Sequence, residues 1–314
     1  MKMNPAIDIV IPIYKPDGRL EKNISRLLKQ TVMPRHIYLL ETVTGEDLYD
    51  VSRINGAGDR VSVHPVKKED FDHGGTRNYG ASLSQSEYIL FMTQDAVPIK
   101  TTLVEKLLES HQKNEQVAVS YGRQLAGKSS GAIEKLTRVF NYPEQSLAKD
   151  ASMLETMGIK AFFCSDVCAM YRRKYFEELG RFVEPAIFNE DMIMARKFLD
   201  AGYGVYYAAD AQVIHSHRYT YMQQFRRNFD LAVSQRQHPE IFADISSESE
   251  GIRMVKQNIG VLCKRGKWYL VPHYIVESGF KFLGYRMGKA YGWLPKRMVR
   301  FCTMDKAYWD KEIH

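Results

Sequence analysis

Several short polar motifs in this chain of 314 residues could do chemistry. Asp95 directly follows an apolar run, where a carboxylate could hold a hard divalent cation against a diphosphate. Asp191, beside Glu190, stands before a helix-like stretch and could act as a general base aimed into a cleft. His215 and His217 alternate along an extended segment, so both imidazole rings could face one metal ion or one diphosphate.

A glycine-rich segment over residues 72–78 reads Asp-His-Gly-Gly-Thr-Arg-Asn and opens an expected helix. Its glycines allow close backbone approach, the helix N-terminus favours a phosphate, and Arg77 offers a fixed fork of donors. Every motif also has a structural explanation. Asp95 can form a turn before Pro98, the acids can stabilise a helix start, the histidines can be surface residues, and Arg77 can pair with a surface acid. Taken singly, the motifs leave both explanations open.

Strands alternate with helices along the first 122 residues. Apolar runs predict strands at 7–14, 36–40, 61–64, 87–92 and 117–121, with helices beginning near 17, 73 and 101. Further strands are expected at 166–171, 205–207 and 213–214, a helix from 189, and aromatic helices from about 219. This order predicts an α/β fold with a Rossmann-like, mostly parallel central sheet flanked by helices and a helical C-terminal extension. Ligands of such sheets lie at the carboxyl ends of the strands, which is where the polar motifs stand.

The composition is that of a globular protein, with 45% hydrophobic and 26% charged residues, which excludes disordered and fibrous classes. Four cysteines in a chain of this length do not form a disulfide framework, and Cys164 and Cys168 are interpreted as buried thiols. We find neither a signal peptide nor an apolar stretch of the roughly 18–20 residues that a spanning helix needs. A reduced, cytoplasmic compartment is therefore expected.

Charge is concentrated near the C-terminus, although the chain as a whole carries +7. Residues 252–314 hold 13 Lys and Arg against 4 Asp and Glu, whereas the first 251 residues hold 31 against 33. In this tail Tyr274, Ser278, Lys281, Tyr285 and Gly288 recur at helical spacing. A basic, aromatic helix suits an anionic membrane surface, but it could equally pack on the rest of the protein or on a second subunit. No nucleic-acid motif is found, so no nucleic-acid partner is expected.

Together, five motifs resemble the family 2 glycosyltransferases with the GT-A fold, and within them the bacterial rhamnosyltransferases. The carrying segments are 9–14, 72–80, 91–96, 189–191 and 215–217. Their order and spacing are specific, whereas each motif alone is not, and the resemblance covers about residues 5–240. It implies a GT-A catalytic domain over 1–240, followed by the basic, aromatic helical region over 241–314.

The resemblance also implies a role for each motif. The donor nucleotide would be bound by Pro12, Tyr14, Glu41, Asp72, Arg77, Asn78, Gln94 and Asp95. Asp95 would be the last acid of an Asp-X-Asp motif that holds Mg²⁺ or Mn²⁺, with His215 or His217 reaching the metal or the diphosphate. Asp191 would be the catalytic base, and Glu190 would lie on the acceptor side.

Two positions depart from the family pattern. Thr93 stands where the first acid of Asp-X-Asp is expected, which removes one charged metal ligand. Glu41 stands where the family often has Asp, which weakens the expected contact to the base.

The expected activity is inverting transfer of L-rhamnose from dTDP-β-L-rhamnose to a glycan or polyprenyl-diphosphate-linked acceptor in cell-surface polysaccharide synthesis. The enzyme would be cytoplasmic, peripheral at the inner face of the cell membrane, with a homo-oligomer left open. Three alternatives remain: a transferase that uses a UDP-sugar, a nucleotidyltransferase that binds a similar donor, and a non-catalytic scaffold that binds sugar nucleotides.

Overall fold

The computed structural model describes residues 5–45, 48–243, 245 and 247–311. They divide into two compact units. The first comprises residues 1–127, 142–184 and 190–215, and the second comprises 128–141, 185–189 and 216–314, apart from the residues that are not described. This division concerns compactness, so the functional domain limits drawn at 240 stay a prediction.

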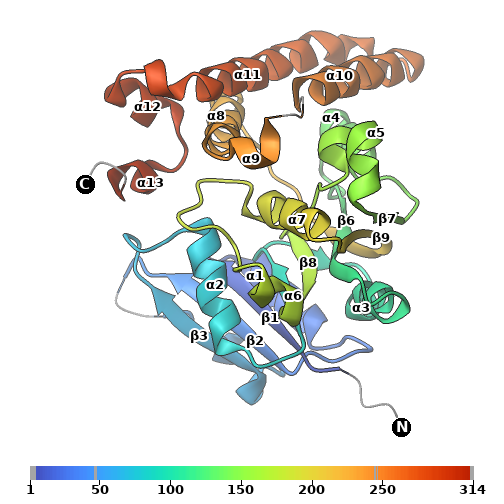
Figure 1. Cartoon of the computed structure of the whole chain (residues 1–314), viewed down its shortest axis with the longest axis vertical. Helices are drawn as coiled ribbons and strands as arrows, with labels where there is room; N and C mark the ends of the chain where they lie inside the picture. The colour runs from blue at the N-terminus through green and yellow to red at the C-terminus, as the bar shows by residue number, and fades with distance from the viewer. Residues whose placement is uncertain (1–4, 46–47, 244, 246, 312–314) are drawn as a thin grey trace. The chain divides into compact units, whose positions relative to one another are not determined.

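All the described strands lie in the first unit and form one sheet (Figure 1). They are β1 (Ile7–Ile13), β2 (His36–Thr42), β3 (Val61–Val66), β4 (Tyr88–Met92), β5 (Val97–Pro98), β6 (Val117–Leu125), β7 (Leu147–Lys149), β8 (Cys168–Arg172) and β9 (Gly204–Ile214). The order is β3-β2-β1-β4-β8-β6-β9-β5, with β7 paired to β9. The strands β3, β2, β1 and β4 are parallel, as are β6 and β9, whereas β8 runs antiparallel to both of its neighbours. The predicted α/β class is confirmed, and the parallel order holds across the N-terminal half of the sheet.

Helices cover both faces of this sheet. Those of the first unit are α1 (Gly18–Leu27), α2 (His73–Leu83), α3 (Leu103–Lys113), α5 (Leu154–Met157), α6 (Arg173–Glu178) and α7 (Glu190–Asp200). Ile9 of β1 belongs to a core that includes Leu20 of α1 and Leu107 of α3. Val10 points to the opposite face, where it meets Gly80 of α2. Since a Cβ atom at Gly80 would collide with Val10, glycine is what lets α2 lie directly on the sheet.

One prediction about the strands is corrected. Residues 205–207 and 213–214 were expected as two strands, but β9 runs unbroken over Gly204–Ile214. The pairing of β9 with β6 shifts in register between Gly122 and Arg123, where residues of β9 are left out of the ladder. Such an irregularity interrupts the pairing without ending the strand, and it hides the strand's continuity in the sequence.

The second unit is helical in its described part. It contains α4 (Ala132–Asn141), α8 (Tyr221–Gln237), α9 (Pro239–Phe242), α10 (Ser247–Lys264), α11 (Val271–Lys289), α12 (Lys296–Cys302) and α13 (Lys306–Lys311). Short 3₁₀ turns in the chain are η1 (Val51–Arg53), η2 (Gly58–Arg60), η3 (Ala151–Met153), η4 (Gly158–Lys160), η5 (Trp268–Leu270) and η6 (Tyr291–Trp293). Leu136 of α4 packs with Leu262 and Tyr274, which joins this early helix to the C-terminal ones. Within the described residues, every helix is too short or too polar to cross a bilayer.

Candidate active site

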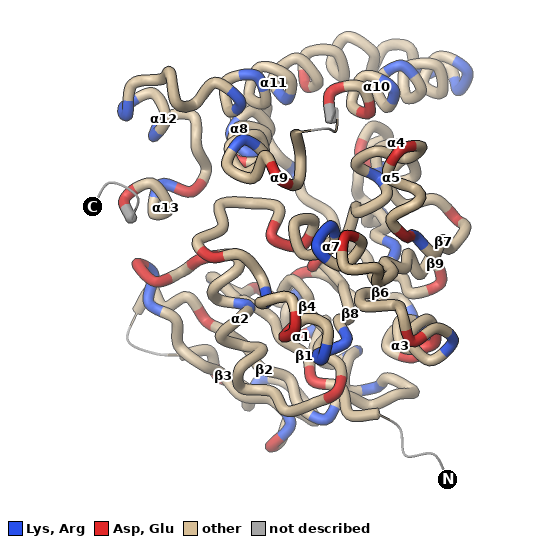
Figure 2. The backbone as a smooth tube through the Cα atoms, viewed as in Figure 1, with Lys and Arg blue, Asp and Glu red and all other residues tan. Residues whose placement is uncertain are grey.

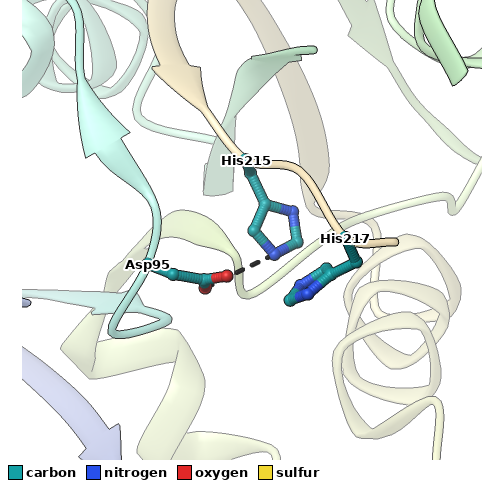
Figure 3. A group of neighbouring side chains, drawn as sticks. All are labelled: Asp95, His215 and His217. Carbon is teal, nitrogen blue, oxygen red and sulfur yellow. Dashed lines mark ion pairs between the residues drawn. The ribbon is translucent and has the colours of Figure 1, made fainter. Parts of the chain in front are cut away.

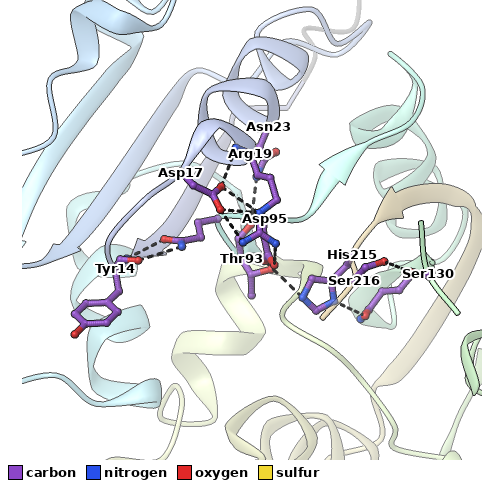
Figure 4. Close-up of polar contacts among 11 residues, drawn as sticks. Tyr14, Asp17, Arg19, Asn23, Thr93, Asp95, Ser130, His215 and Ser216 are labelled. Atoms are coloured by element: carbon purple, nitrogen blue, oxygen red, sulfur yellow. Dashed lines mark hydrogen bonds and ion pairs between the residues drawn. The ribbon is translucent and has the colours of Figure 1, made fainter. Parts of the chain in front are cut away.

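The loops that follow β1 and β4 are joined by one side chain. β1 and β4 are parallel neighbours, so their carboxyl ends meet at the same edge of the sheet. The backbone N–H of Tyr14 donates to Oε1 of Gln94 at 2.8 Å, and Nε2 of Gln94 donates back to the carbonyl of Tyr14 at 3.1 Å. The side chain of Gln94 therefore fixes the Tyr14 backbone. Tyr14 itself is 44% exposed and leaves its ring accessible (Figure 4).

Asp95 lies between the guanidinium of Arg19 and the ring of His215. Its Oδ2 accepts from Nη1 of Arg19 at 3.3 Å, and Arg19 also pairs with Asp17 at 2.8 Å (Figure 4). Asp17 begins α1 as its N-cap, because its carboxylate accepts from the backbone N–H of Arg19. Thr93, in the place of the expected first acid, has a buried hydroxyl oxygen with no hydrogen-bond partner among the described residues.

Asp95, His215 and His217 form a candidate metal centre (Figure 3). One ligand atom from each residue lies within 4.8 Å of the others. Nε2 of His215 lies 3.5 Å from Oδ1 of Asp95. His215 is the last residue of the first unit, and His217 follows it by two positions.

The hydrogen bond on the other ring nitrogen of His215 supports this assignment. Nδ1 lies 3.0 Å from Oε1 of Gln124, a carbonyl oxygen that can only accept, so Nδ1 carries the proton. In the neutral form of the ring the lone pair is then on Nε2, which lies 3.5 Å from Oδ1 of Asp95. Two electron-pair donors that face each other are satisfied by a cation between them, and a fixed tautomer of this kind is typical of metal-binding histidines. A set with two imidazole nitrogens suits Mg²⁺ poorly, because Mg²⁺ prefers oxygen ligands throughout.

A second cluster surrounds Arg77, which was predicted to line the nucleotide pocket. Nη1 of Arg77 lies 2.9 Å from Oε1 of Glu190, and Nε lies 3.4 Å from Oδ2 of Asp166. Arg77, Asp166 and Glu190 are all buried, whereas Asp191 retains partial exposure. Asp191 is therefore the least buried acid of this cluster.

The carboxylate of Asp191 is held by two backbone donors. The N–H of Asp166 donates to Oδ2 at 3.1 Å, and the N–H of Met192 donates to Oδ1 at 2.7 Å. Asn189, just before α7, adopts φ of +64°, a left-handed conformation that asparagine tolerates better than most residues. The turn at Asn189 and the two backbone donors together fix where Asp191 points.

Burial, together with the neighbouring charge of Glu190, raises the pKa of Asp191 to about 7 against the opposing effects of the Asp166 N–H and Arg77. Burial likewise raises the pKa of Asp166 well above its usual value, although Arg77 opposes this and the hydroxyl of Tyr171 donates to it at 2.7 Å. Three carboxyl groups thus share one guanidinium. Such a cluster retains a proton near neutral pH because the acids repel one another in a poorly solvated place.

One short segment touches both clusters. The hydroxyl of Ser165 accepts from Nε2 of Gln124 at 2.9 Å, and Gln124 in turn bonds His215. The next residue, Asp166, holds Asp191, and the carbonyl of Val167 accepts from the N–H of Thr93 at 3.3 Å. Residues 165–167 therefore connect the loop of Asp95 and the ring of His215 with the carboxylate of Asp191.

The remaining predicted residues are bonded to protein groups. Asp72 caps α2 by accepting from the N–H of Gly75. Asn78 donates to the carbonyl of Phe182 at 2.9 Å, and Glu41 accepts from the N–H of Tyr49 at 2.6 Å. Pro12 lies in β1, and the part that these residues play in donor binding stays a prediction.

Sequence analysis missed three residues that position the site. Arg19 could have been found as a cation two places after the capping Asp17. Gln124 lies near the end of β6 and was passed over because no motif contains it. Asp166 lies between two cysteines, and Cys164 and Cys168 are both buried thiols as predicted. That segment was interpreted only for its thiols, so its acid was overlooked.

The chain is similar to known proteins along most of its length. The model of the family described as "Glycosyl transferase family 2" matches residues 8–180. The O-antigen chain rhamnosyltransferase RfbN of Salmonella typhimurium is 34% identical over 308 residues, which is 97% of this chain and 96% of that protein. The O-antigen chain rhamnosyltransferase WbaN of Salmonella anatum is 34% identical over 309 residues, with 98% and 96% covered.

Two solved structures share the fold. The mannosyltransferase PcManGT from Pyrobaculum calidifontis, in complex with GDP-Man and Mn²⁺, superimposes with a TM-score of 0.56 at 14% identity, covering 99% of this chain and 88% of that one. S. aureus TarS 1–349, in complex with UDP-GlcNAc, gives 0.53 at 12% identity, with 91% of both chains covered. At such low identity the likeness concerns the fold.

Proposed function

Because this chain belongs to glycosyl transferase family 2, we propose that it moves L-rhamnose from dTDP-β-L-rhamnose onto a hydroxyl group of a growing glycan. It is a glycosyltransferase, and it resembles rhamnosyltransferases along nearly its whole length. The O-antigen role of these relatives supports a role for this chain in O-antigen or a similar cell-surface polysaccharide. A UDP-sugar is the alternative donor.

Asp191 is the base in this proposal. Its carboxylate takes the proton of the acceptor hydroxyl as that oxygen attacks the anomeric carbon from the face opposite the leaving diphosphate. A single displacement inverts the configuration, so a β-L donor gives an α-L-rhamnoside. The pKa of about 7 supports this role, because it gives a base that is both strong and largely deprotonated slightly above neutral pH. Glu190 lies on the acceptor side and keeps that pKa high.

Asp95, His215 and His217 would hold a divalent cation, Mn²⁺ rather than Mg²⁺ by their ligand chemistry. When bound, such a cation stabilises the negative charge that develops on the leaving diphosphate. Arg19, paired with Asp95, adds a second positive charge at the same edge of the sheet.

We assign the remaining predicted residues to the nucleotide side of the donor. Tyr14 offers an exposed ring next to the backbone that Gln94 fixes, which suits stacking on a base. Pro12 and Glu41 would line the same edge. Asp72, Arg77 and Asn78 would act by shaping α2 and the acidic cluster, since their side chains already engage protein groups.

The acceptor is proposed to be a glycan or a polyprenyl-diphosphate-linked glycan, met at the inner face of the cell membrane by a cytoplasmic enzyme. The region over 241–314 would make the membrane contact, and catalysis would belong to 1–240. A homo-oligomer through the same region is the competing use of this surface.

The observation that carries the proposal is the segment 165–167, which contacts both the loop of Asp95 and the carboxylate of Asp191. A base and a candidate diphosphate site linked in this way are what a displacement at an anomeric carbon requires.

Product analysis tests the reaction class. The purified chain is incubated with Mn²⁺, an acceptor glycan and a panel of dTDP- and UDP-sugars, and the released products are separated by chromatography. We expect release of dTDP from dTDP-β-L-rhamnose in step with glycan extension. Release of a sugar 1-phosphate would instead indicate a nucleotidyltransferase, and donor binding without release of either product would indicate a scaffold.

A further inference from the structure

Helix α11 has an inner face fixed by close packing. The side chain of Tyr274 is fully buried, and its hydroxyl accepts from Nδ2 of Asn258 at 3.0 Å. A Cβ atom at Gly284 would overlap the backbone carbonyl of Phe225 in α8, and Gly288 is equally close to its own neighbours in α8. The stripe that begins at Tyr274 and includes Gly288 was a candidate membrane face in the sequence, but it is turned inward. It is therefore not the surface that α11 offers to a partner.

The outward side of η5 and α11 carries exposed apolar residues in pairs. They are Trp268 and Tyr269 at 70% and 62% exposure, Ile275 and Val276 at 53% and 46%, and Phe282 and Leu283 at 48% and 56%. Successive pairs lie seven residues apart, which is close to two helical turns, so the pairs on α11 share one face. The exposed residues between them are Pro272, His273 and Gly279. Among its described residues, this face carries no Asp, Glu, Lys or Arg from Trp268 to Leu283.

Lysine and arginine residues lie at both ends of this face. Figure 2 draws those of α10, α11 and α12 in blue. Lys264, Arg265 and Lys267 are exposed just before it, and Arg286 is exposed just after it. Further along, Lys296 and Arg297 are exposed as well, next to Trp293 at 91% exposure. The apolar stripe is therefore bounded by positive charge.

We propose that this face of η5 and α11, residues 268–283, lies on an anionic bilayer surface with its aromatic and aliphatic side chains inserted among the headgroups. Large exposed apolar side chains gain free energy by leaving water, and Trp and Tyr prefer the interface. The flanking lysines and arginines are attracted to anionic lipid. A helix with this distribution lies in the plane of the interface and does not span the bilayer.

A second copy of the chain fits this face less well. A helix pair needs apolar residues at alternating spacings of three and four, but three positions after Ile275 and Phe282 stand Ser278 and Tyr285, which are only partly exposed. The hydroxyl of Tyr285 is already bonded to Gln235 at 2.9 Å. A symmetric pair would also bring like-charged ends of two tails together. Anionic lipid has the opposite charge to the two ends of this face, whereas a second copy of the chain has the same charge.

This inference deepens the peripheral location proposed above, but its test measures vesicle binding alone, so it can fail while the transferase activity stands. Full-length protein is mixed with vesicles of equal parts phosphatidylcholine and phosphatidylglycerol, and bound protein is separated by flotation. The test variant is Trp268→Ser/Ile275→Ser/Phe282→Ser. The matched control, Met33→Ser/Val139→Ser, removes exposed apolar side chains from outside this face.

We expect the triple variant to bind at least about tenfold more weakly than the wild type and the control variant to bind unchanged. Arg265→Gln/Lys267→Gln should weaken binding about fivefold for each cation removed. All variants should melt at the wild-type temperature, since the replaced side chains are exposed.

A fluorescence readout in the wild-type fold guards against misfolding of the variants. Brominated lipid should quench tryptophan emission, and Trp268→Phe should reduce that quenching. Equal vesicle binding by the triple variant and the control would overturn the proposal, as would wild-type protein that stays unbound. A wild-type dimer that the triple variant converts to monomer would assign the face to a second copy instead.

Discussion

Asp95 and Asp191 are two carboxylates at one edge of the fold whose neighbours differ in sign. Asp95 is met by the guanidinium of Arg19 and the ring of His215. Asp191 lies beside the acid Glu190 and is held by backbone N–H groups, with burial raising its pKa to about 7. A carboxylate that faces an imidazole nitrogen suits a cation, whereas one beside another acid keeps its basicity. Both residues are aspartates, so their surroundings rather than the residue type suit one to metal binding and the other to a base.

The largest effect is expected from removing the base. Asp191→Asn should lower kcat about 10²- to 10⁴-fold, because an amide cannot accept the acceptor's proton. Steady-state release of dTDP measures this loss. Asp200→Asn, at the exposed end of the same helix, is the matched control and should retain activity. A wild-type kcat in Asp191→Asn would show that Asp191 is not the catalytic base.

Substitutions around Asp95 should weaken metal binding and leave proton transfer to Asp191 unchanged. His215→Ala should weaken activation by Mn²⁺ about 10- to 100-fold, and Gln124→Ala should do so less, because Gln124 only orients the ring. Titrations of activity with Mn²⁺ after treatment with a chelator give both constants. If the chelated wild type keeps full activity, the cation has no part in the reaction. The pH profile of these variants should match that of the wild type.

The pH dependence of kcat/KM distinguishes the role of Asp191 from that of Asp95. Activity needs ionised Asp191, so kcat/KM should rise with pH and level off above about 7. Glu190→Gln removes the largest repulsive charge on Asp191, so the rise should move to lower pH by roughly one unit. Asp95→Asn should leave the position of the rise unchanged. An unmoved profile in Glu190→Gln would show that the two acids are not coupled.

The smallest effect concerns stability. Folded Asp191 has a raised pKa, so its contribution to the free energy of unfolding is fully present below the unfolded value near 4 and is lost as pH rises through about 7. Asp191→Asn removes this dependence. The melting temperature of the variant minus that of the wild type should therefore increase between pH 5 and pH 8, by at least about 2 °C. Calorimetry at both pH values checks the sign, and a difference that shrinks would contradict the raised pKa.

The central strands β1 and β4 could be predicted because they are buried on both faces and read as continuous apolar runs. β1 is such a run, and the polar residues after β1 and β4 were picked out before any resemblance was considered. The unbroken β9 could not be predicted, since its register shift against β6 leaves no mark in the residue types. The inward stripe of α11 was equally hidden, because aromatic side chains at helical spacing suit a packed face and a lipid face alike.

The sequence by itself determined the alternation of strands and helices, the family, and the residue types that stand at the strand ends. These follow from local hydrophobic periodicity and from short motifs, which a linear chain displays. Only the tertiary structure decided that Asp166, Arg77 and Glu190 form one buried cluster around the base, and that Gln124 sets the tautomer of His215. These contacts join residues 89, 113 and 91 positions apart. Their electrostatic effect arises only when folding removes water from between them.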